Sequence, residues 1–156
     1  MSAGPSTRSL KPPPLVAMAL AFAGGAAGSA LRVASDHAGA ALGLPPWAAT
    51  LCVNVVACFL GGLLGRLLLG RVTRREAIAA EVLDAYTVRA HRLTMLLVTG
   101  FCGGLSTFSA LGQEIHELVR LQQPGQSLLV VALSLALGMT SVWAGLALGM
   151  RLNRDR

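Results

Sequence analysis

The chain has 156 residues, of which 54% are hydrophobic and 13% charged, and its formal net charge is +6. With a mean hydropathy of +0.63, the composition is too apolar for a soluble domain of this length and indicates a membrane protein. The basic residues stand at the ends of apolar runs, without interleaved aromatics, so nucleic acid is excluded as the expected partner and membrane lipid is favoured.

The first apolar run extends from Leu15 to Leu31 and follows residues 1–14, an N-terminal stretch that we expect to be flexible. A bilayer-crossing helix needs about 20 apolar residues, which this run approaches. Gly24 and Gly28 have the GxxxG spacing that lets two helices approach closely. The small residues near the end of the run also fit a cleaved signal peptide, which is the alternative interpretation.

The second run, Trp47 to Leu69, follows a short polar link whose prolines suit the start of a helix. Asn54 lies near its middle, where an amide without a partner costs about 1 kcal/mol or more. Helical spacing puts Thr50, Asn54 and Gly61 on one flank. Asn54 is therefore expected either to line a pore or to make a structural bond to another helix.

Residues 71–92 form a longer and more charged link. Within it, the stretch from Arg74 to His91 mixes apolar and charged residues in a helical pattern. We expect a separate surface helix here, lying on the membrane face or fully solvated.

The third run, Leu93 to Leu111, contains the most informative segment of the chain. From Gly100 to Ser109 it reads GFCGGLSTFS, which places glycines, hydroxyls and aromatic rings inside an apolar span. A break at membrane depth is tolerated only where the freed backbone groups line a cavity or contact protein. The sequence therefore predicts a third helix broken in mid-membrane, whose carbonyl and amide groups serve as ligands.

The fourth run extends from Ser127 to Met150 and is followed by a basic tail, residues 151–156. Ser134, Gly138 and Ser141 share one helical face that suits a pathway of hydroxyl groups. Hydroxyls bonded back to their own helix explain the same pattern equally well.

The four runs predict an all-α membrane protein, with residues 15–150 as one four-helix transmembrane domain. An even number of spans puts both termini on one side, and the positive-inside rule makes that side cytoplasmic in a multi-pass plasma-membrane protein. Ten basic residues fall on it, against Arg32 and Arg120 on the other: Arg8, Lys11, Arg71, Arg74, Arg75, Arg89, Arg92, Arg151, Arg154 and Arg156.

The sequence contains no motif typical of a catalytic site. The three cysteines stand singly in apolar runs, and the three histidines fall in links without metal-ligand spacing. No nucleophile elbow or phosphate loop is present, so we do not expect an enzyme. All seven acidic residues fall outside the apolar runs, which leaves no expected carboxylate for proton coupling in the membrane.

Residues 24–32, 50–59 and 100–109 resemble, in order, the three signatures of the Fluc (CrcB-type) fluoride channels. The resemblance covers the chain from about Gly24 to Met150. It implies passive export of cytoplasmic fluoride by an antiparallel dimer with two pores, each lined by both subunits. It also implies a structural sodium ion at the dimer centre, held by the carbonyl oxygens of Gly103 and Ser106.

The resemblance further assigns residues to the anion pathway. Phe108 would face fluoride with its ring edge, and Asn54 would donate its amide to the same ion. Ser109 and Ser134 would extend the polar track. Arg32, at the end of the first helix, would attract anions or fix the fold, and that role argues against signal cleavage before it.

The chain departs from the family pattern at three positions: Leu111 replaces the second pore phenylalanine, Ala57 replaces a glycine, and Val130 stands near an expected aromatic. The strong basic asymmetry is also unexpected for a chain that inserts in both orientations. Both features favour the hypothesis of a heterodimer, in which this chain is a weakly conducting or non-conducting partner. A small multidrug-type transporter and a non-transporting scaffold are the remaining alternatives, although the transporter needs a membrane carboxylate.

Overall fold

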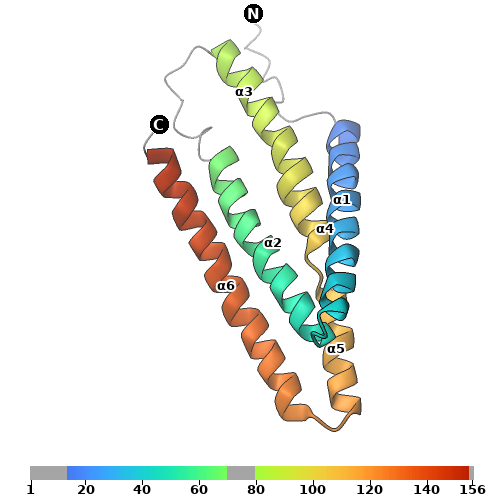
Figure 1. Cartoon of the computed structure of the whole chain (residues 1–156). Helices are drawn as coiled ribbons and strands as arrows, with labels where there is room; N and C mark the ends of the chain where they lie inside the picture. The colour runs from blue at the N-terminus through green and yellow to red at the C-terminus, as the bar shows by residue number, and fades with distance from the viewer. Residues whose placement is uncertain (1–13, 70–79, 155–156) are drawn as a thin grey trace, which may run out of the picture.

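The computed structural model describes residues 14–69 and 80–154. All regular structure in these residues is helical (Figure 1). Four helical stretches are long and apolar enough to cross a membrane, which confirms the predicted all-α class with four spans: Pro14–Ala41, Pro46–Leu68, Thr87–Arg120 and Pro124–Asn153. The seven elements are α1 Pro14–Ala41, α2 Pro46–Leu69, α3 Ala80–Leu93, the π-helix η1 Thr94–Cys102, α4 Gly103–Leu105, α5 Phe108–Arg120 and α6 Pro124–Arg154.

Helix α1 packs tightly against η1 and α4 through glycines on both sides. A Cβ atom added to Gly24 would lie 2.8 Å from Phe101 N, and one added to Gly28 would lie 2.8 Å from Leu105 N. A Cβ atom on Gly100 would meet Ala21 O at 2.7 Å. The predicted close approach at Gly24 and Gly28 is confirmed, and its partner is the third span.

A second extensive contact joins α2 to α6 along much of their length (Figure 1). It has the same physical basis, because a Cβ atom on Gly62 would lie 3.2 Å from Leu146 N and one on Gly145 would lie 2.9 Å from Leu63 N. Small residues let backbones approach within van der Waals distance where hydrocarbon gives no hydrophobic drive for helix association.

The first helix continues well past its expected end. The polar stretch from Val33 onward was predicted to be a link, but α1 runs to Ala41. Ser35 bonds back to Leu31 O at 2.9 Å. The helix ends in a Schellman motif, with Gly43 at φ 70°, Gly43 N bonded to Ala40 O at 3.0 Å, and Leu44 N bonded to Gly39 O at 3.0 Å. Gly43 therefore terminates α1, whereas the polar residues that precede it do not.

The expected separate surface helix is also wrong for the part of the link that the structure describes. Helix α3 begins at Ala80 and passes without interruption into η1, so it extends the third membrane span. Residues 70–79 and the N-terminal residues 1–13 lie outside the described residues. At the other end of the chain, α6 remains helical through Arg154, so most of the expected tail continues the fourth helix.

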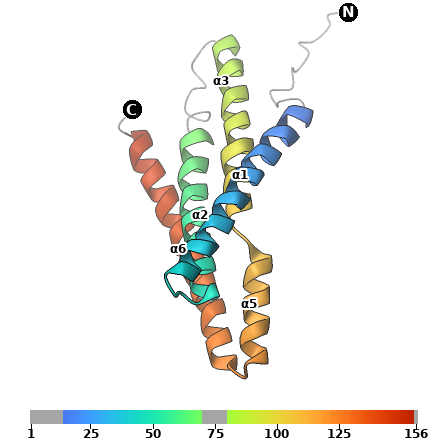
Figure 2. The same ribbon diagram turned by 45° about the vertical axis from the view of Figure 1, so that its right-hand side comes forward.

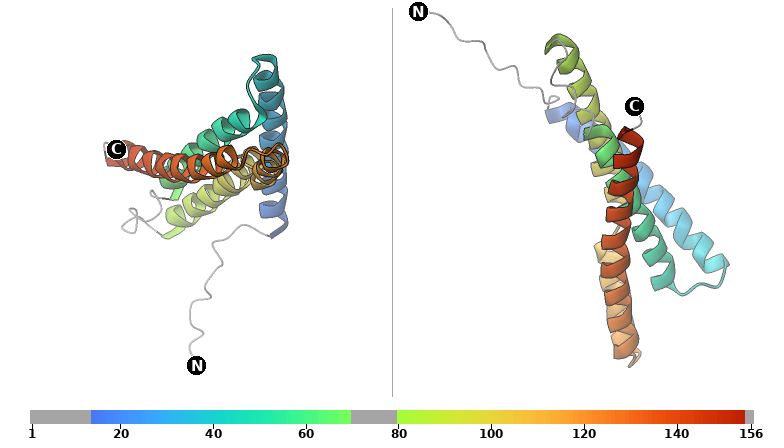
Figure 3. Two further views of the ribbon diagram at one scale, coloured as in Figure 1. Left: turned by 90° about the horizontal axis from the view of Figure 1, so that it is seen from below. Right: turned by 90° about the vertical axis from the view of Figure 1, so that its left-hand side faces the viewer.

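The helices splay apart instead of forming a closed bundle. Figure 2 shows α1 crossing the third span obliquely, and Figure 3 shows that the meeting ends of α1 and α2 diverge from α5 and α6. The described buried apolar side chains are few: Ala57, Ala90, Cys102, Leu105, Leu118 and Val130. Much apolar surface is consequently left for lipid or another chain to cover.

Candidate functional site at the helix break

The third span breaks between α4 and α5. Ser106 and Thr107 are extended, with φ and ψ of −78° and 151° for Ser106 and −150° and 130° for Thr107. Ser106 N still bonds to Cys102 O at 3.0 Å, which makes it the last amide of the helical pattern. A new helix starts at Phe108. The break predicted within residues 100–109 is confirmed at this point.

Asn54 fixes the break from the neighbouring helix. Its Oδ1 accepts a hydrogen bond from Thr107 N at 2.9 Å, and its Nδ2 donates to Thr107 O at 3.2 Å. We call this pair of bonds the Asn54–Thr107 clasp. It satisfies both backbone groups of the central extended residue, which hydrocarbon would leave unpaired. Of the two roles expected for Asn54, the interhelical bond is present, and one N–H of the amide remains for another acceptor.

The break also frees two carbonyl oxygens, one through the clasp and one through the cap that Thr107 provides for α5. In an uninterrupted helix Gly103 O would accept from Thr107 N, which here donates to Asn54. Ser106 O would accept from Ala110 N, which here donates to Thr107 Oγ1 at 3.4 Å. These are the two carbonyls that the family resemblance assigned to a cation. Carbonyl oxygens without a helical donor are suitable ligands for a hard cation, so the backbone fits that assignment.

Phe108 and Ser109, the first two residues of α5 after the break, are both exposed. The Phe108 side chain is 85% exposed at the first position of α5. Ser109 Oγ lies 3.0 Å from Thr107 Oγ1 and is also exposed. The break thus joins Asn54, Thr107 and Ser109 by hydrogen bonds, and the exposed Phe108 lies between Thr107 and Ser109 in the chain.

Ser134 is not joined to this locality by a hydrogen bond. Its hydroxyl, on α6, donates to Val130 O at 2.7 Å, one turn earlier in the same helix. Between the two explanations left open by the sequence, the back-bonded hydroxyl is the one observed. Its lone pairs remain available, but its proton does not.

Arg32 occupies a different place from the one expected. It lies inside α1, nine residues before the helix ends at Ala41, because the helix continues through the supposed link. Its Nε lies 3.8 Å from Asp36 Oδ2 one turn later. Arg32 and Asp36 line a cavity of about 330 Å³ together with Thr50, Gln113 and Glu114. We call this the arginine cavity.

The arginine cavity contains an interaction that the sequence did not reveal. Thr50 Oγ1 donates to Glu114 Oε1 at 2.6 Å, and Glu114 Oε2 is buried without a hydrogen-bond partner among the described residues. Glu114 lies beyond the apolar run Leu93 to Leu111, as expected, but it belongs to the same long helical stretch, Thr87–Arg120, and its bond to Thr50 is part-buried. Two spacings in the sequence are consistent with this interaction: Thr50 lies one helical turn from Asn54, and Glu114 lies two turns from Thr107, so each pair lies on one face.

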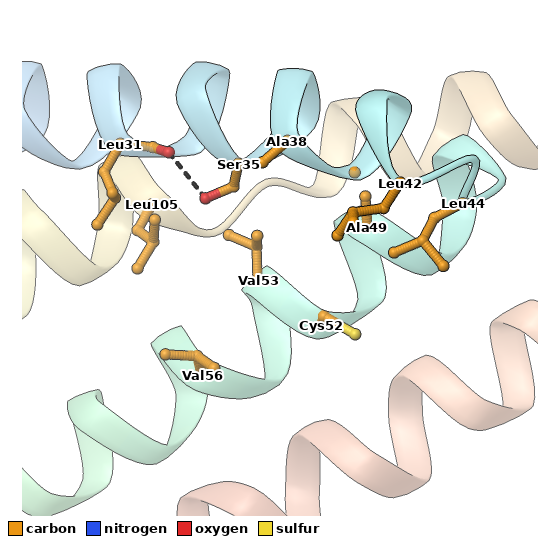
Figure 4. Close-up of a pocket in the computed structure, with 11 residues that line it drawn as sticks. Leu31, Ser35, Ala38, Leu42, Leu44, Ala49, Cys52, Val53, Val56 and Leu105 are labelled. Atoms are coloured by element: carbon orange, nitrogen blue, oxygen red, sulfur yellow. Dashed lines mark hydrogen bonds between the residues drawn. The ribbon is translucent and has the colours of Figure 1, made fainter.

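A second, apolar cavity of about 350 Å³ lies between α1 and α2 (Figure 4). Leu31 and Leu105 face Val53 and Val56 across it, and the only hydrogen bond drawn there is the helical one from Ser35 to Leu31. Such a lining suits hydrocarbon or another apolar surface and not an anion. Of the sites named so far in the described residues, the break and the arginine cavity are therefore the ones with polar groups for an anion.

Comparison with known proteins places the chain in a family. The family model described as CrcB-like protein, camphor resistance (CrcB), matches residues 19–146. A Rhizobium etli protein is 37% identical over 131 residues, covering 83% of this chain and 92% of its own. An Agrobacterium fabrum protein is 35% identical over 140 residues, covering 88% and 99%, and a Prosthecochloris aestuarii protein is 34% identical over 134 residues, covering 85% and 91%. All three relatives are named fluoride-specific ion channel FluC. The break, the clasp and the glycine contacts all fall within the matched region, and the chain belongs to the CrcB-like family.

Proposed function

We propose that the chain is a subunit of a passive, fluoride-selective channel that lets cytoplasmic fluoride leave the cell. The observation that carries the proposal is the Asn54–Thr107 clasp, which fixes an amide donor at the residue that precedes the exposed Phe108 in the chain. The name shared by the relatives supports fluoride as the ion. Neutral HF crosses lipid and ionises in a less acidic cytoplasm, so a passive pore for the anion relieves the trapped load.

The anion pathway in this proposal begins with the free N–H of Asn54. A small anion that has lost part of its water can accept this proton and contact the positive edge of the Phe108 ring. Ser109 adds a hydroxyl one residue along, and Ser134 contributes lone pairs or, after breaking its bond to Val130, a proton. Arg32 raises the local anion concentration at the arginine cavity, where Asp36 and Glu114 offset part of its charge.

The functional unit that we propose is an antiparallel dimer. An 85% exposed Phe108, between the hydroxyl residues Thr107 and Ser109 in the chain, suits a pore wall completed by a second subunit. In an antiparallel pair, the breaks of both subunits would meet near mid-membrane. Carbonyl oxygens of Gly103 and Ser106 from the two chains would then hold a sodium ion, whose role is to neutralise oxygens that the break leaves without donors.

We also propose that the chain sits in the plasma membrane with both termini cytoplasmic and that it transports without catalysing a reaction. The orientation rests on the ten-to-two distribution of basic residues. Outward movement of an anion is favoured by about 2.3 kcal/mol per 100 mV of negative-inside potential, so no energy source is needed. Asp36, Glu114 and Glu117 all lie in described helical stretches long enough to cross a membrane. The bond of Glu114 to Thr50 and its neighbour Arg32 favour a structural role over proton exchange.

A second candidate is a weakly conducting or non-conducting partner subunit in a heterodimer. The half-buried Leu111 favours it, since it brings no ring edge where the family has a second phenylalanine. The strong basic asymmetry favours it too, because a chain with one orientation needs an oppositely oriented partner to form an antiparallel pair.

The test is fluoride efflux from liposomes that contain the purified chain, with chloride efflux as the selectivity control. The channel proposal predicts fluoride release without measurable chloride release. Equal release of both ions would contradict it. Release only after adding an oppositely oriented family member would favour the heterodimer, and full release from the chain alone would eliminate the need for a partner.

A further inference from the structure

Side chains of α2 and α6 line a groove near the ends of these two helices. Helix α1 begins at the same end of the molecule (Figure 1). The groove has a volume of about 460 Å³, and its Arg66 lies about three turns of α2 beyond Asn54, the residue that contacts the helix break. Its lining residues are Arg66, Trp143, Ala147, Met150 and Arg151. We call it the terminal groove.

Arg66 is held in the terminal groove by two contacts from α6. A Cβ atom added to Gly149 would lie 2.9 Å from Arg66 Cβ and 3.0 Å from its Cγ, so the stem of the arginine packs over the bare glycine backbone. Asn153 Nδ2 donates to Arg66 O at 3.2 Å. Contacts to its carbonyl oxygen and to its Cβ and Cγ atoms thus position Arg66, which is an exposed residue.

The charge of the terminal groove is not neutralised by the described part of the chain. Arg66 and Arg151 both line it, and neither forms an ion pair with a described residue. Two guanidinium groups at one groove attract a shared anion, and guanidinium is well suited to phosphate oxygens.

The remaining surface of the terminal groove is apolar and lies at the end of two membrane spans. Trp143 is 74% exposed and Met150 is 45% exposed. The exposed apolar face continues along α6 toward mid-membrane through Met139 and Leu135, which are 74% and 64% exposed. Arg66 and Arg151 lie near the ends of their helices and match the headgroup level of a bilayer. Trp143, two turns before Arg151 on α6, and the apolar face beyond it match an acyl chain.

We propose that the terminal groove binds an anionic phospholipid, with the phosphate between Arg66 and Arg151 and an acyl chain along the exposed face of α6. A second copy of this chain would bring more positive charge if its own terminal groove docked here, which disfavours that occupant. Free phosphate would use the arginines but leave Trp143, Met150 and Met139 uncovered. The proposal requires only a membrane-spanning chain and does not depend on which ion the protein conducts.

The test measures lipid binding by the full chain in detergent, using native mass spectrometry with phosphatidylglycerol and phosphatidylcholine of identical acyl chains. The test variant is Arg66→Gln/Arg151→Gln. The matched control is Arg89→Gln/Arg92→Gln, which removes the same charge from exposed side chains outside the terminal groove. Arg151→Gln alone is measured as well. Its side chain forms no hydrogen bond or ion pair with a described residue, so we do not expect this variant to have a folding defect.

The expected result is a preference of the unaltered chain and the control for phosphatidylglycerol over phosphatidylcholine. The double variant should lose about tenfold or more of that preference, the weight expected for two basic residues at an anionic lipid. The single variant should lose part of it. The proposal is overturned if the test variant keeps its preference, or if the control loses as much, since diffuse charge would then explain binding.

Two further measurements separate the other occupants. Inorganic phosphate at millimolar concentration should not displace the bound phosphatidylglycerol, and full displacement would identify a simple anion site and reject the lipid. The spectra also report the oligomeric state. If the double variant loses dimers while its monomers still prefer phosphatidylglycerol, the terminal groove is a protein interface and the proposal fails.

Discussion

Replacing Asn54 with leucine removes the clasp while nearly keeping the shape of the side chain. The change deletes the bonds to Thr107 N and Thr107 O, at 2.9 and 3.2 Å, and leaves both backbone groups half-buried without partners. At about 1 kcal/mol per bond, we expect a loss of about 2 kcal/mol of stability, and more in hydrocarbon, where water cannot substitute. Asn54→Asp keeps the acceptor for Thr107 N but loses the donor, so it should lose about 1 kcal/mol.

The two variants make different predictions for transport. Asn54→Leu should abolish fluoride efflux from liposomes, because both the geometry of the break and the donor for the anion are lost. Asn54→Asp should retain most of the stability yet lose nearly all efflux, since a carboxylate repels the anion at the position of the amide. Stability is followed by thermal unfolding in detergent, and efflux by a fluoride electrode at matched protein incorporation.

The matched control is Thr140→Val, which removes a hydroxyl that bonds only to its own helix, at 2.8 Å to Ala136 O and 3.1 Å to Leu137 O. It should leave both measurements nearly unchanged. Normal efflux from Asn54→Leu would refute the reasoning outright. Equal stability of Asn54→Leu and Asn54→Asp would show that the bond from Thr107 N to Oδ1 contributes nothing.

Three other substitutions test separate parts of the structure. Gly28→Ala should lower the free energy of unfolding by about 1–3 kcal/mol through overpacking, since its Cβ would lie 2.8 Å from Leu105 N. The control Gly61→Ala places its Cβ in open space and should have a melting temperature no lower than that of the unaltered chain. Equal melting temperatures of the two variants would contradict the close contact at Gly28. Thr50→Val leaves both Glu114 carboxylate oxygens without donors, so it should lower the melting temperature and reduce the free energy of unfolding by about 1–3 kcal/mol. Thr50→Ser keeps the hydroxyl and should restore the melting temperature. If serine fails to restore it, the hydroxyl is not the stabilising group. Leu111→Phe should raise fluoride efflux severalfold if the missing ring limits conduction, and unchanged efflux at matched incorporation would remove Leu111 as the explanation.

The sequence predicted the features that are encoded locally. The break between Gly100 and Ser109 was predictable because glycines and hydroxyls in an apolar run leave backbone groups that need partners. The GxxxG spacing of Gly24 and Gly28 predicted close contact for a similar reason, since the spacing itself creates the flat surface. It did not predict the partner, which depends on how separate helices pack.

The features that the sequence missed arise from tertiary contacts or from overlooked end signals. Thr107 is 53 residues from Asn54, and Glu114 is 64 residues from Thr50. Helical spacing puts Thr50 and Asn54 on one face and Thr107 and Glu114 on another, but it does not show that these two faces meet. The end of α1 was misplaced because polar residues were treated as a link, although a helix near a membrane surface tolerates them and Gly43 supplies the stop. The surface helix was misassigned because amphipathic periodicity is the same for a separate helix and for the end of a longer one.

The clasp has a consequence for how the protein is made. Chains enter the membrane from the N-terminus onward, so the helix that carries Asn54 is synthesised before the segment that contains Thr107. The partner amide is therefore already in the bilayer when the third span arrives. That span can enter as an ordinary helix and open only when it docks against its predecessor, so that the exposed peptide groups of Thr107 need never face lipid alone.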